Sequence, residues 1–327
     1  METKRPTIPA AEEILGGYFP VLDHGFVSLV DYMGSDDDVE RAARVSYGYG
    51  TRKLSQTRGL VRYLRRHRHT TPSEMVELKF HCAMPMFVAR QWIRHRSASV
   101  NEYSARYSLL PLLFYKPDAE SFALQSRTNR QGRGEPAPRE LWKAALERWE
   151  RIRSEASAGY EWLLGEDVAR ELARIDLPLS TYTQWYWKID LHNLFHFLSL
   201  RADPHAQWEI REYARAIGGM LKRVAPLSFE AWVDYELGGA AMSHGELDAL
   251  RGLIEPRGED GIAVRSGVAE LGGAALAELG LSKREVLEFL EKLEPRTLPD
   301  FELDLSRMRA PEAVAAEMER AVPGVFE

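Results

Sequence analysis

The feature that most constrains the fold is the regular placement of an apolar residue at every second position between residues 76 and 84. These positions are Val76, Leu78, Phe80, Cys82 and Met84. A period of two is typical of a β-strand that buries one face. Residues 26–33 and the aromatic segment 179–188 give similar strand signals. The sequence therefore predicts a sheet to which these three segments contribute.

Helices are expected around these strands. The longest is expected from about residue 138 to residue 164, and Asp190 stands where it can cap a helix over residues 191–201. Together the segments predict an α+β fold in which a mixed or antiparallel sheet is flanked by long helices. Residues 115–140 show no apolar period and are interpreted as a loop.

Two further helix starts are predicted from capping signals. Thr71, Pro72 and Glu74 fit an N-cap, a first-turn proline and the glutamate of a capping box. Asp167 stands where it can cap a helix over residues 168–175.

Charge and cysteine content exclude several classes of protein. The 327-residue chain has a net charge of −6, which argues against a general nucleic-acid-binding protein. Cys82 is the only cysteine, so no disulfide can form within the chain. The sequence has neither an apolar signal core near its start nor a run of membrane-spanning length. We therefore expect a cytoplasmic protein with no membrane partner.

Positive charge is concentrated between residues 90 and 107. This segment holds four arginines and a single carboxylate, namely Arg90, Arg94, Arg96, Arg106 and Glu102. A surface stabilised by ion pairs would contain more acidic partners, whereas the planar forks of arginine bind phosphate or carboxylate in bidentate fashion. The segment predicts a site for a ligand with more than one phosphate, or for two anionic ligands side by side.

Two other interpretations are open on these residues alone. A nucleic-acid-binding module would use the same arginines, although the overall acidity and the inserted Glu102 count against it. A metal-dependent phosphohydrolase would use His192, His196, Asp203 and His205, because the first two share one helix face. That stretch lacks a His-Glu-x-x-His pattern, and a proline interrupts it before His205.

The arginine-rich segment resembles the signature of the flavin-dependent thymidylate synthases, the ThyX family. From Arg94 to Tyr107 it matches the pattern Arg-His-Arg-x-x-Ser-x-Asn-Glu-x-Ser-x-Arg-Tyr at all nine fixed positions. His69 to Glu74 resembles the family motif His-x-Thr-Pro-x-Glu, and residues 190–201 resemble a further family region.

The extent of the resemblance suggests where the domains begin and end. It runs from about residue 26 to residue 236, so we expect the synthase domain there and a loosely held leader over residues 1–25. Residues 237–327 are expected to form a small helical extension, with its clearest helix at residues 282–293. The sequence assigns no role to this extension.

The resemblance implies a ThyX-like fold and the reductive methylation of dUMP to dTMP. 5,10-Methylenetetrahydrofolate would be the carbon donor, and FAD, reduced by NADPH, the hydride source. The family also implies a homotetramer in which each active site is shared between subunits, with no nucleic-acid partner.

The resemblance assigns residues to both nucleotides and none to a metal. For dUMP it implies Gln91, Arg94, Glu102, Tyr103, Ser104, Ala105, Arg106, Arg174 and Arg201. For FAD it implies Ser46, His69, Thr71, Glu74, Arg94, His95, Arg96, Glu102, Asp190, His192 and His196. Arg201 is assigned the catalytic role, because a guanidinium can stabilise the negative charge that builds on the uracil ring as C5 becomes nucleophilic.

No covalent nucleophile is expected from this chain. Cys82 is predicted to lie on the inward face of a strand, where a thiol is inert. Ser104 has no evident histidine–carboxylate pair to activate it. The sequence therefore favours methyl transfer without an enzyme–substrate adduct.

Overall fold

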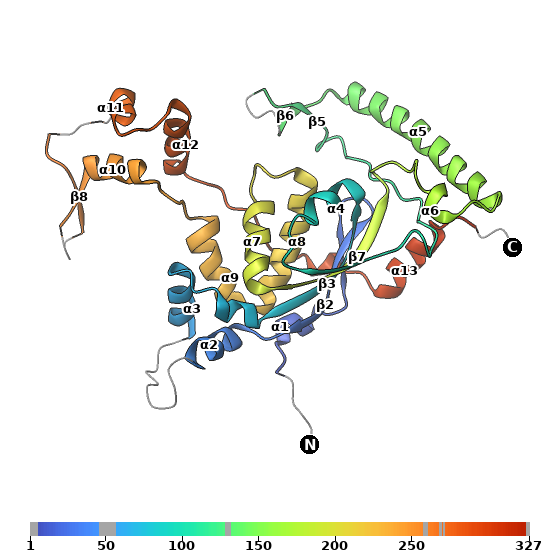
Figure 1. The fold of residues 1–327 in the computed structure, drawn as a ribbon, viewed down its shortest axis with the longest axis horizontal. Coiled ribbons are helices and arrows are strands. Elements are labelled where there is room, and N and C mark those ends of the chain that lie inside the picture. Colours follow the sequence, from blue (N-terminus) through green and yellow to red (C-terminus); the bar gives the residue numbers. More distant parts are fainter. Residues whose placement is uncertain are drawn as a thin grey trace, which may run out of the picture. The chain divides into compact units, whose positions relative to one another are not determined.

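The structure is a computed structural model that describes residues 6–45, 57–127, 132–257, 261–267, 270 and 272–324. The chain divides into two compact units, which we describe separately (Figure 1). The first unit consists of residues 1–232 and 299–327, and the second of residues 233–298. All the predicted site residues belong to the first unit.

The first unit is built on a sheet of five strands within the described part of the chain. The strands are β1 (Tyr18–Val21), β2 (Gly25–Met33), β3 (Glu77–Pro85), β4 (Ser99–Glu102) and β7 (Tyr182–Asp190). Their order is β1-β2-β3-β7-β4, and each neighbouring pair is antiparallel. The predicted α+β class and the three predicted strands are confirmed.

Helices surround this sheet in Figure 1. They are α1 (Pro9–Glu12), α2 (Asp36–Arg44), α3 (Thr57–Arg66), the 3-10 helix η2 (Thr71–Met75), α4 (Met86–Trp92), α5 (Arg139–Gly165), α6 (Arg170–Ala173), α7 (Leu191–Arg201), α8 (Trp208–Val224), α9 (Pro226–Trp232), the 3-10 helix η5 (Leu305–Arg307) and α13 (Pro311–Arg320). The long helix α5 and the Asp190-capped helix α7 confirm their predictions.

Burial in the sheet follows the alternation in the sequence. Leu78, Phe80 and Cys82 of β3 are fully buried on one face. Helices α4, α7 and α8 cover this face, and Trp92 of α4 packs edge-on against Trp187 of β7 with ring centroids 5.1 Å apart. Aromatic rings in this arrangement add to the stability that burial provides. This packing anchors the arginine-rich segment at Trp92, after which the segment continues beyond α4.

The opposite face of the sheet is covered by residues near the C-terminal end of the chain. Val314 of α13 packs on Phe26 of β2 and Ala83 of β3, and Met318 lies against the same cluster. Before α13 the chain runs beside β1, where Tyr18 and Arg309 form an antiparallel bridge. Residues 299–324 therefore complete the core of the first unit.

Glycine permits a close approach between this C-terminal segment and α8. Phe301 is buried, with its ring against the rings of Phe229 and Trp232 of α9. A Cβ atom on Gly218 would lie 2.3 Å from Cδ1 of Phe301. Only a residue without a side chain leaves room for the ring at this position.

The expected leader and extension differ from what the structure shows. Residues 1–25 were expected to be loosely held, yet α1 and β1 pack into the first unit, with Ala11 and Ile14 fully buried. Residues 237–327 were expected to form one extension, but the part from residue 299 onwards belongs to the first unit. Both segments pack against residues distant in the sequence, so local periodicity does not reveal their burial.

Three local predictions were also wrong. The 115–140 segment contains a two-stranded sheet, β5 (Ala123–Gln125) and β6 (Arg133–Pro136), and Arg133 of β6 pairs with Glu209 of α8. Asp167 adopts a left-handed backbone with φ of 58° and does not cap α6, which starts after Ala169. Thr71 lies inside η2, whose N-cap residue Thr70 makes no side-chain capping bond.

The second unit is small and mainly helical. Its elements are the π-helix η3 (Val233–Leu237), α10 (His244–Leu253), β8 (Ile254–Pro256), β9 (Ile262–Val264), α11 (Gly273–Glu278) and α12 (Lys283–Leu293). Ala249, Leu276, Leu281 and Phe289 form its core. Ser282 and Glu285 make the predicted capping box of α12. In the described part of the chain, no helix combines the length and the apolar character that a membrane span requires.

Candidate active site

The arginine-rich segment leaves the core at a fixed point. Trp92 is fully buried at the end of α4, while Arg94 and Arg96 are exposed two and four residues further on. Neither arginine has an ion-pair partner among the described residues. Since uncompensated guanidinium groups on one short segment repel one another, their arrangement favours an anionic ligand.

A cavity of about 280 Å³ lies beside these arginines. It is lined by Arg94, His95, Arg96, Ser97, Ile189, Asn193, His196, Leu200 and Arg201. Three of these residues are arginines and two are histidines, whereas none is a carboxylate. The segment after α4 and helix α7 thus supply opposite walls of a cavity suited to negative charge.

Arg201 is held in this cavity by two hydrogen bonds. Its Nε donates to Nε2 of His95 over 2.9 Å, and its Nη2 donates to the backbone oxygen of Gln91 over 3.2 Å. Burial lowers the pKa of Arg201 from its usual value, although an arginine stays charged. Its remaining N–H groups have no partner among the described residues, so they are available to a ligand.

His95 is neutral in this environment. Burial, the nearby guanidinium of Arg201 and His196 together lower the pKa of His95 to about 4. Because Arg201 can only donate, Nε2 of His95 is the acceptor and its proton is on Nδ1. The ring lies 4.9 Å from that of Phe197 and 5.8 Å from that of His196, measured between centroids.

The predicted dUMP residues after β4 form a second group. Tyr103 is held by its backbone N–H, 2.8 Å from the oxygen of Gln184, and by its hydroxyl, which donates to the oxygen of Leu109 over 2.6 Å. Ala105 is buried, and Oγ of Ser104 accepts from the backbone N–H of Arg106 over 3.3 Å. These contacts fix the backbone and leave Arg106 exposed.

Two arginine contacts tie this second group to α6. Nε of Arg106 donates to Glu171 over 2.9 Å, and Nη1 of Arg170 donates to the backbone oxygen of Tyr107 over 2.5 Å. Arg174 stands at the C-terminal end of the same short helix. Glu102, the single carboxylate between residues 90 and 107, accepts a hydrogen bond from Thr183 over 2.8 Å.

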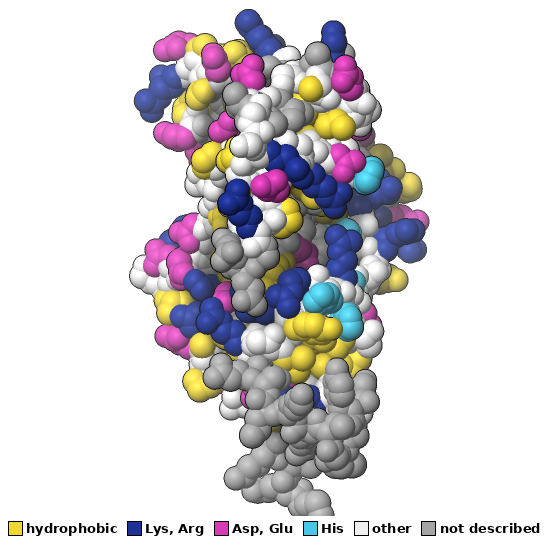
Figure 2. Space-filling model, turned by 90° about the vertical axis from the view of Figure 1, so that its left-hand side faces the viewer, with side chains coloured by type: hydrophobic (Ala, Val, Ile, Leu, Met, Phe, Trp, Pro, Cys, Tyr) yellow, Lys and Arg dark blue, Asp and Glu magenta, His cyan; other side chains and the backbone are white. Residues whose placement is uncertain are grey.

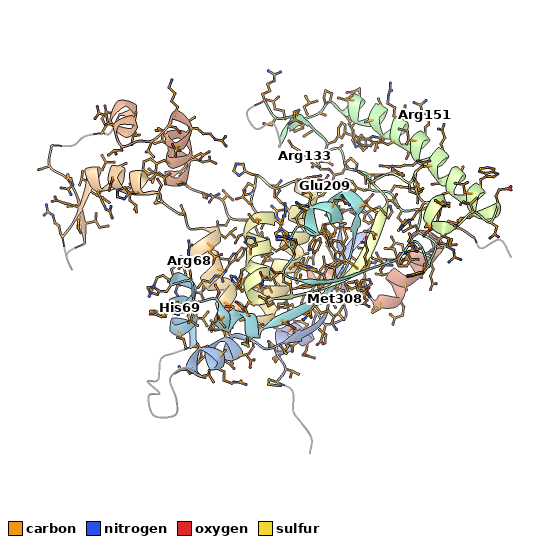
Figure 3. All side chains as sticks on the ribbon, viewed as in Figure 1. Arg68, His69, Arg133, Arg151, Glu209 and Met308 are labelled. Carbon is orange, nitrogen blue, oxygen red and sulfur yellow. The ribbon has the colours of Figure 1, made fainter. Side chains whose placement is uncertain are left out.

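Besides Arg94, His95, Arg96 and Glu102, the predicted flavin residues in the described part of the chain are His69 just after α3, Thr71 and Glu74 on η2, Asp190 at the end of β7, and His192 and His196 on α7. The backbone N–H of Leu191 donates to the oxygen of Val76 over 2.8 Å, which joins the end of η2 to the start of α7. Figure 3 shows Arg68 and His69 at the end of α3. The ring of His69 lies 5.9 Å from that of Tyr63. Figure 2 shows that basic and histidine side chains gather on the side of the molecule where α3 lies.

The other predicted flavin residues differ in their surroundings. Thr71 and Glu74 are exposed on η2. The carboxylate of Asp190 caps α7 by accepting from the backbone N–H and Nδ2 of Asn193. Nδ1 of His192 is buried without a hydrogen-bond partner among the described residues. Ser46 lies outside the described residues.

The structure brings some predicted residues together and separates others. Arg94, His95, Arg96, His196 and Arg201 line one cavity, and Gln91 contacts Arg201. The lining of that cavity does not include Ser104, Arg106, Arg174 or the residues of η2. Ser97 and Asn193 also line this cavity, although neither was predicted. Asn193 is three residues before His196 on α7, so helical spacing was the signal that would have found it.

Among the described residues, no group of three His, Cys, Asp or Glu side chains is placed to hold a metal ion. The structure therefore does not support a metal centre there. His205 instead contacts Asp203, with 2.9 Å between Nδ1 and Oδ1. His196 lies beside His95 in the arginine-lined cavity.

Comparison with known proteins agrees with this geometry. Residues 28–227 match the family model described as thymidylate synthase complementing protein. A flavin-dependent thymidylate synthase from Gluconobacter oxydans (strain 621H) is 56% identical over 252 residues, covering 76% of this chain and 83% of the relative. One from Rickettsia conorii (strain ATCC VR-613 / Malish 7) is 50% identical over 265 residues, covering 77% and 90%.

A solved structure is similar in both fold and sequence. It is the UMP/dUMP methylase PolB from Streptomyces cacaoi bound with 5-Br UMP, with a TM-score of 0.61 and 34% identity. The match covers 67% of this chain and 98% of that chain. Because the family model matches more than half of the sequence and the relatives span most of it, this chain belongs to the flavin-dependent thymidylate synthase family.

Proposed function

We propose that this protein catalyses the reductive methylation of dUMP to dTMP. 5,10-Methylenetetrahydrofolate is the carbon donor, and FAD, reduced by NADPH, supplies the hydride. The observation that carries the proposal is the cavity beside Arg201, which is lined by three arginines and two histidines and by no carboxylate. Family membership does not favour the metal-dependent phosphohydrolase or the nucleic-acid-binding module.

The residues of this cavity have the chemistry that a dinucleotide needs. Arg94 and Arg96 are exposed cations that can bind phosphate in bidentate fashion. We assign them, with His95, to the pyrophosphate of FAD. His196, His192 and Asp190 of α7, together with His69, Thr71 and Glu74, are assigned to the rest of the cofactor, as is Ser46. Glu102 and Arg94 are assigned to both nucleotides.

We assign the substrate to the group of residues around α6 and the segment after β4. Arg106 and Arg174, with Gln91 and Ser104, would bind the phosphate of dUMP, and Tyr103 and Ala105 would form the wall of its site. The guanidinium of Arg201 would face the uracil ring, where its free N–H groups would stabilise charge at O4 and N3. The hydrogen bonds to His95 and Gln91 would hold it in place while this charge develops.

We further propose a homotetramer in which subunits share each active site. The cavity of about 280 Å³ lies just below the size range of typical ligand pockets, whereas FAD is larger than most ligands. Ser104, Arg106 and Arg174 do not line this cavity. Within one chain, the residues assigned to FAD and those assigned to dUMP therefore lie at separate places. A cytoplasmic location is proposed because the chain, with one buried cysteine, has no intrachain disulfide.

The visible absorbance spectrum of the purified protein tests this proposal. We expect a flavin band that bleaches when NADPH is added anaerobically, followed by dTMP formation when dUMP and methylenetetrahydrofolate are supplied. A protein that takes up no added FAD would refute the proposed cofactor. A protein that binds FAD but forms no dTMP would retain the flavin assignment and refute the proposed reaction.

A further inference from the structure

A second cavity lies in the first unit, away from the Arg201 cavity. Its volume is about 400 Å³, and it shares no lining residue with the other cavity. Its walls come from α5, from the β5–β6 segment, from the start of α8 and from the chain before β7. This volume lies within the range of small-molecule sites in proteins. None of the residues predicted for dUMP or FAD lines it.

The walls of this cavity are largely aromatic. Phe87, Phe122 and Trp149 line it together with Ile152 and two prolines. Phe122 packs edge-on against Trp149, with ring centroids 6.0 Å apart and an interplanar angle of 79°. Flat apolar groups stack favourably against such rings. The shape and chemistry of the walls therefore favour a planar ring system.

One buried cation in this cavity lacks a full set of partners. Arg153 of α5 is only 8% exposed, and its Nη2 donates to the backbone oxygen of Tyr115 over 2.5 Å. Its Nη1 has no hydrogen-bond partner among the described residues. The guanidinium carbon lies 5.8 Å from the ring centroid of Trp149, another lining residue. An incompletely paired buried cation is costly unless a ligand satisfies it.

The other charged groups of the cavity neutralise each other. Arg133 of β6 forms an ion pair with Glu209 of α8, which Figure 3 shows as neighbours, and also donates to the backbone oxygen of Ser121 over 2.7 Å. Among the lining residues this pair leaves one charge, that of Arg153, which also interacts electrostatically with Asp23 and Glu150 outside the lining. The cavity thus combines aromatic walls with one net positive charge.

We infer that this cavity binds a planar aromatic ligand with a single negative charge, such as an aromatic monocarboxylate. Its ring would lie between the aromatic walls, and its carboxylate would accept from Nη1 of Arg153. The folate co-substrate also contains a benzoyl group, but its glutamate tail carries two carboxylates. A cavity whose lining residues carry one net positive charge, with one unpartnered donor on Arg153, favours the monoanion over such a tail.

Calorimetric titration with 2-naphthoate tests the inference, with 2-naphthamide as the neutral ligand of equal shape. The full-length protein is first saturated with FAD and dUMP, so that the other anion-binding groups are occupied. We expect saturable binding of naphthoate that is about tenfold to a hundredfold tighter than that of naphthamide, as for a charge-assisted hydrogen bond. Folic acid at equal concentration should not displace it.

Variants on α5 locate the binding site. Arg153→Met should remove the preference for naphthoate over naphthamide. Arg151→Met is the matched control, since Arg151 is exposed two residues earlier on the same helix, and should leave the preference unchanged (Figure 3). Ile152 is 58% exposed at the cavity, so Ile152→Glu should weaken naphthoate binding at least about fivefold relative to Ile152→Gln without disturbing the fold.

Three results would overturn the inference. The first is equal affinity for naphthoate and naphthamide, or no binding of either. The second is an equal loss of binding in Arg151→Met and Arg153→Met. The third is displacement of naphthoate by folic acid, which would assign the cavity to the co-substrate. If Arg153→Met does not fold, the comparison of Ile152→Glu with Ile152→Gln decides the question.

Discussion

Nε of Arg201 donates to Nε2 of His95 over 2.9 Å, so the residue that we assign to the uracil ring is held by a residue of the Arg-His-Arg motif. This bond requires an unprotonated Nε2, which agrees with the lowered pKa of His95. The geometry couples two parts of the sequence that are 106 residues apart. The orientation of Arg201 thus depends on the protonation state of His95.

The first prediction concerns Arg201. Arg201→Lys keeps a positive charge but loses the planar fork that bonds His95 and Gln91 at once. We expect kcat to fall by about 100-fold or more, as for the loss of a donor to a developing anion, while FAD affinity changes less than about threefold. Steady-state dTMP formation and FAD titration measure the two effects.

Arg223→Lys is the matched control, since Arg223 contacts Ala10 and Glu13 outside the site. It should leave both quantities unchanged. Parallel loss of FAD binding and turnover in Arg201→Lys would instead show that Arg201 supports the fold of the site.

The second prediction concerns pH. The pKa of His95 is about 4 in the folded protein, whereas an unfolded chain has a value near 6.5. Between these values the unfolded state binds a proton that the folded state excludes, so the free energy of unfolding falls as the pH falls from about 6.5 to 4. His95→Gln removes this contribution, which we expect to be about 1 kcal/mol after allowance for its partial exposure.

Urea denaturation at pH 7.5 and at pH 4.5 checks this prediction. The loss of stability between the two pH values should be smaller in His95→Gln than in the unaltered protein. Other titrating groups affect both proteins alike, so the difference reports on His95. If the free energy of unfolding fell equally in the two proteins, His95 would not be held neutral by its surroundings in the folded state.

The third prediction concerns Cys82. Burial raises the pKa of its thiol well above the usual value, and the side chain is fully buried in β3. A thiol in this state is a poor nucleophile. We expect Cys82→Ala to retain turnover within about twofold per folded molecule, with a stability loss of roughly 1–2 kcal/mol from the small cavity. A thiol reagent should react only after unfolding; reaction of the native protein at the rate of a free thiol would argue the opposite.

The fourth prediction concerns the C-terminal segment. Gly218→Ala places a methyl group against the ring of Phe301, which is confined by Phe229 and Trp232. Overpacking of this kind costs about 1–3 kcal/mol. Gly159→Ala in α5 is the control, because its Cβ would meet no atom within 4 Å. It should stabilise the helix by about 0.5–1 kcal/mol.

Thermal unfolding of both variants measures these effects. Opposite shifts in Tm are expected for the two glycines. If Gly218→Ala were neutral, the segment from residue 299 onwards would not be packed on α8 as described.

The sequence by itself determined the elements whose signals are local. Alternation along residues 76–84 is enough to predict β3, because a period of two buries one face wherever the sheet lies. Asp190 is followed at once by a helical period, and its carboxylate caps α7 as expected. The Arg-His-Arg motif likewise predicted an anion site, since so many arginines without acidic neighbours need a negative ligand.

Only the tertiary structure decided features that depend on distant partners. Arg133 appeared to lie in an irregular loop, yet it belongs to β6 and pairs with Glu209 of α8, 76 residues away. The C-terminal helix α13 gave no sign of covering Phe26 and Ala83. Arg201 and His95 meet only because the sheet sets β7 beside β3 and so brings α7 to the end of α4. Hydrogen bonds and burial depend on which residues are neighbours in space. Sequence spacing predicts such neighbours only within a few turns of one helix.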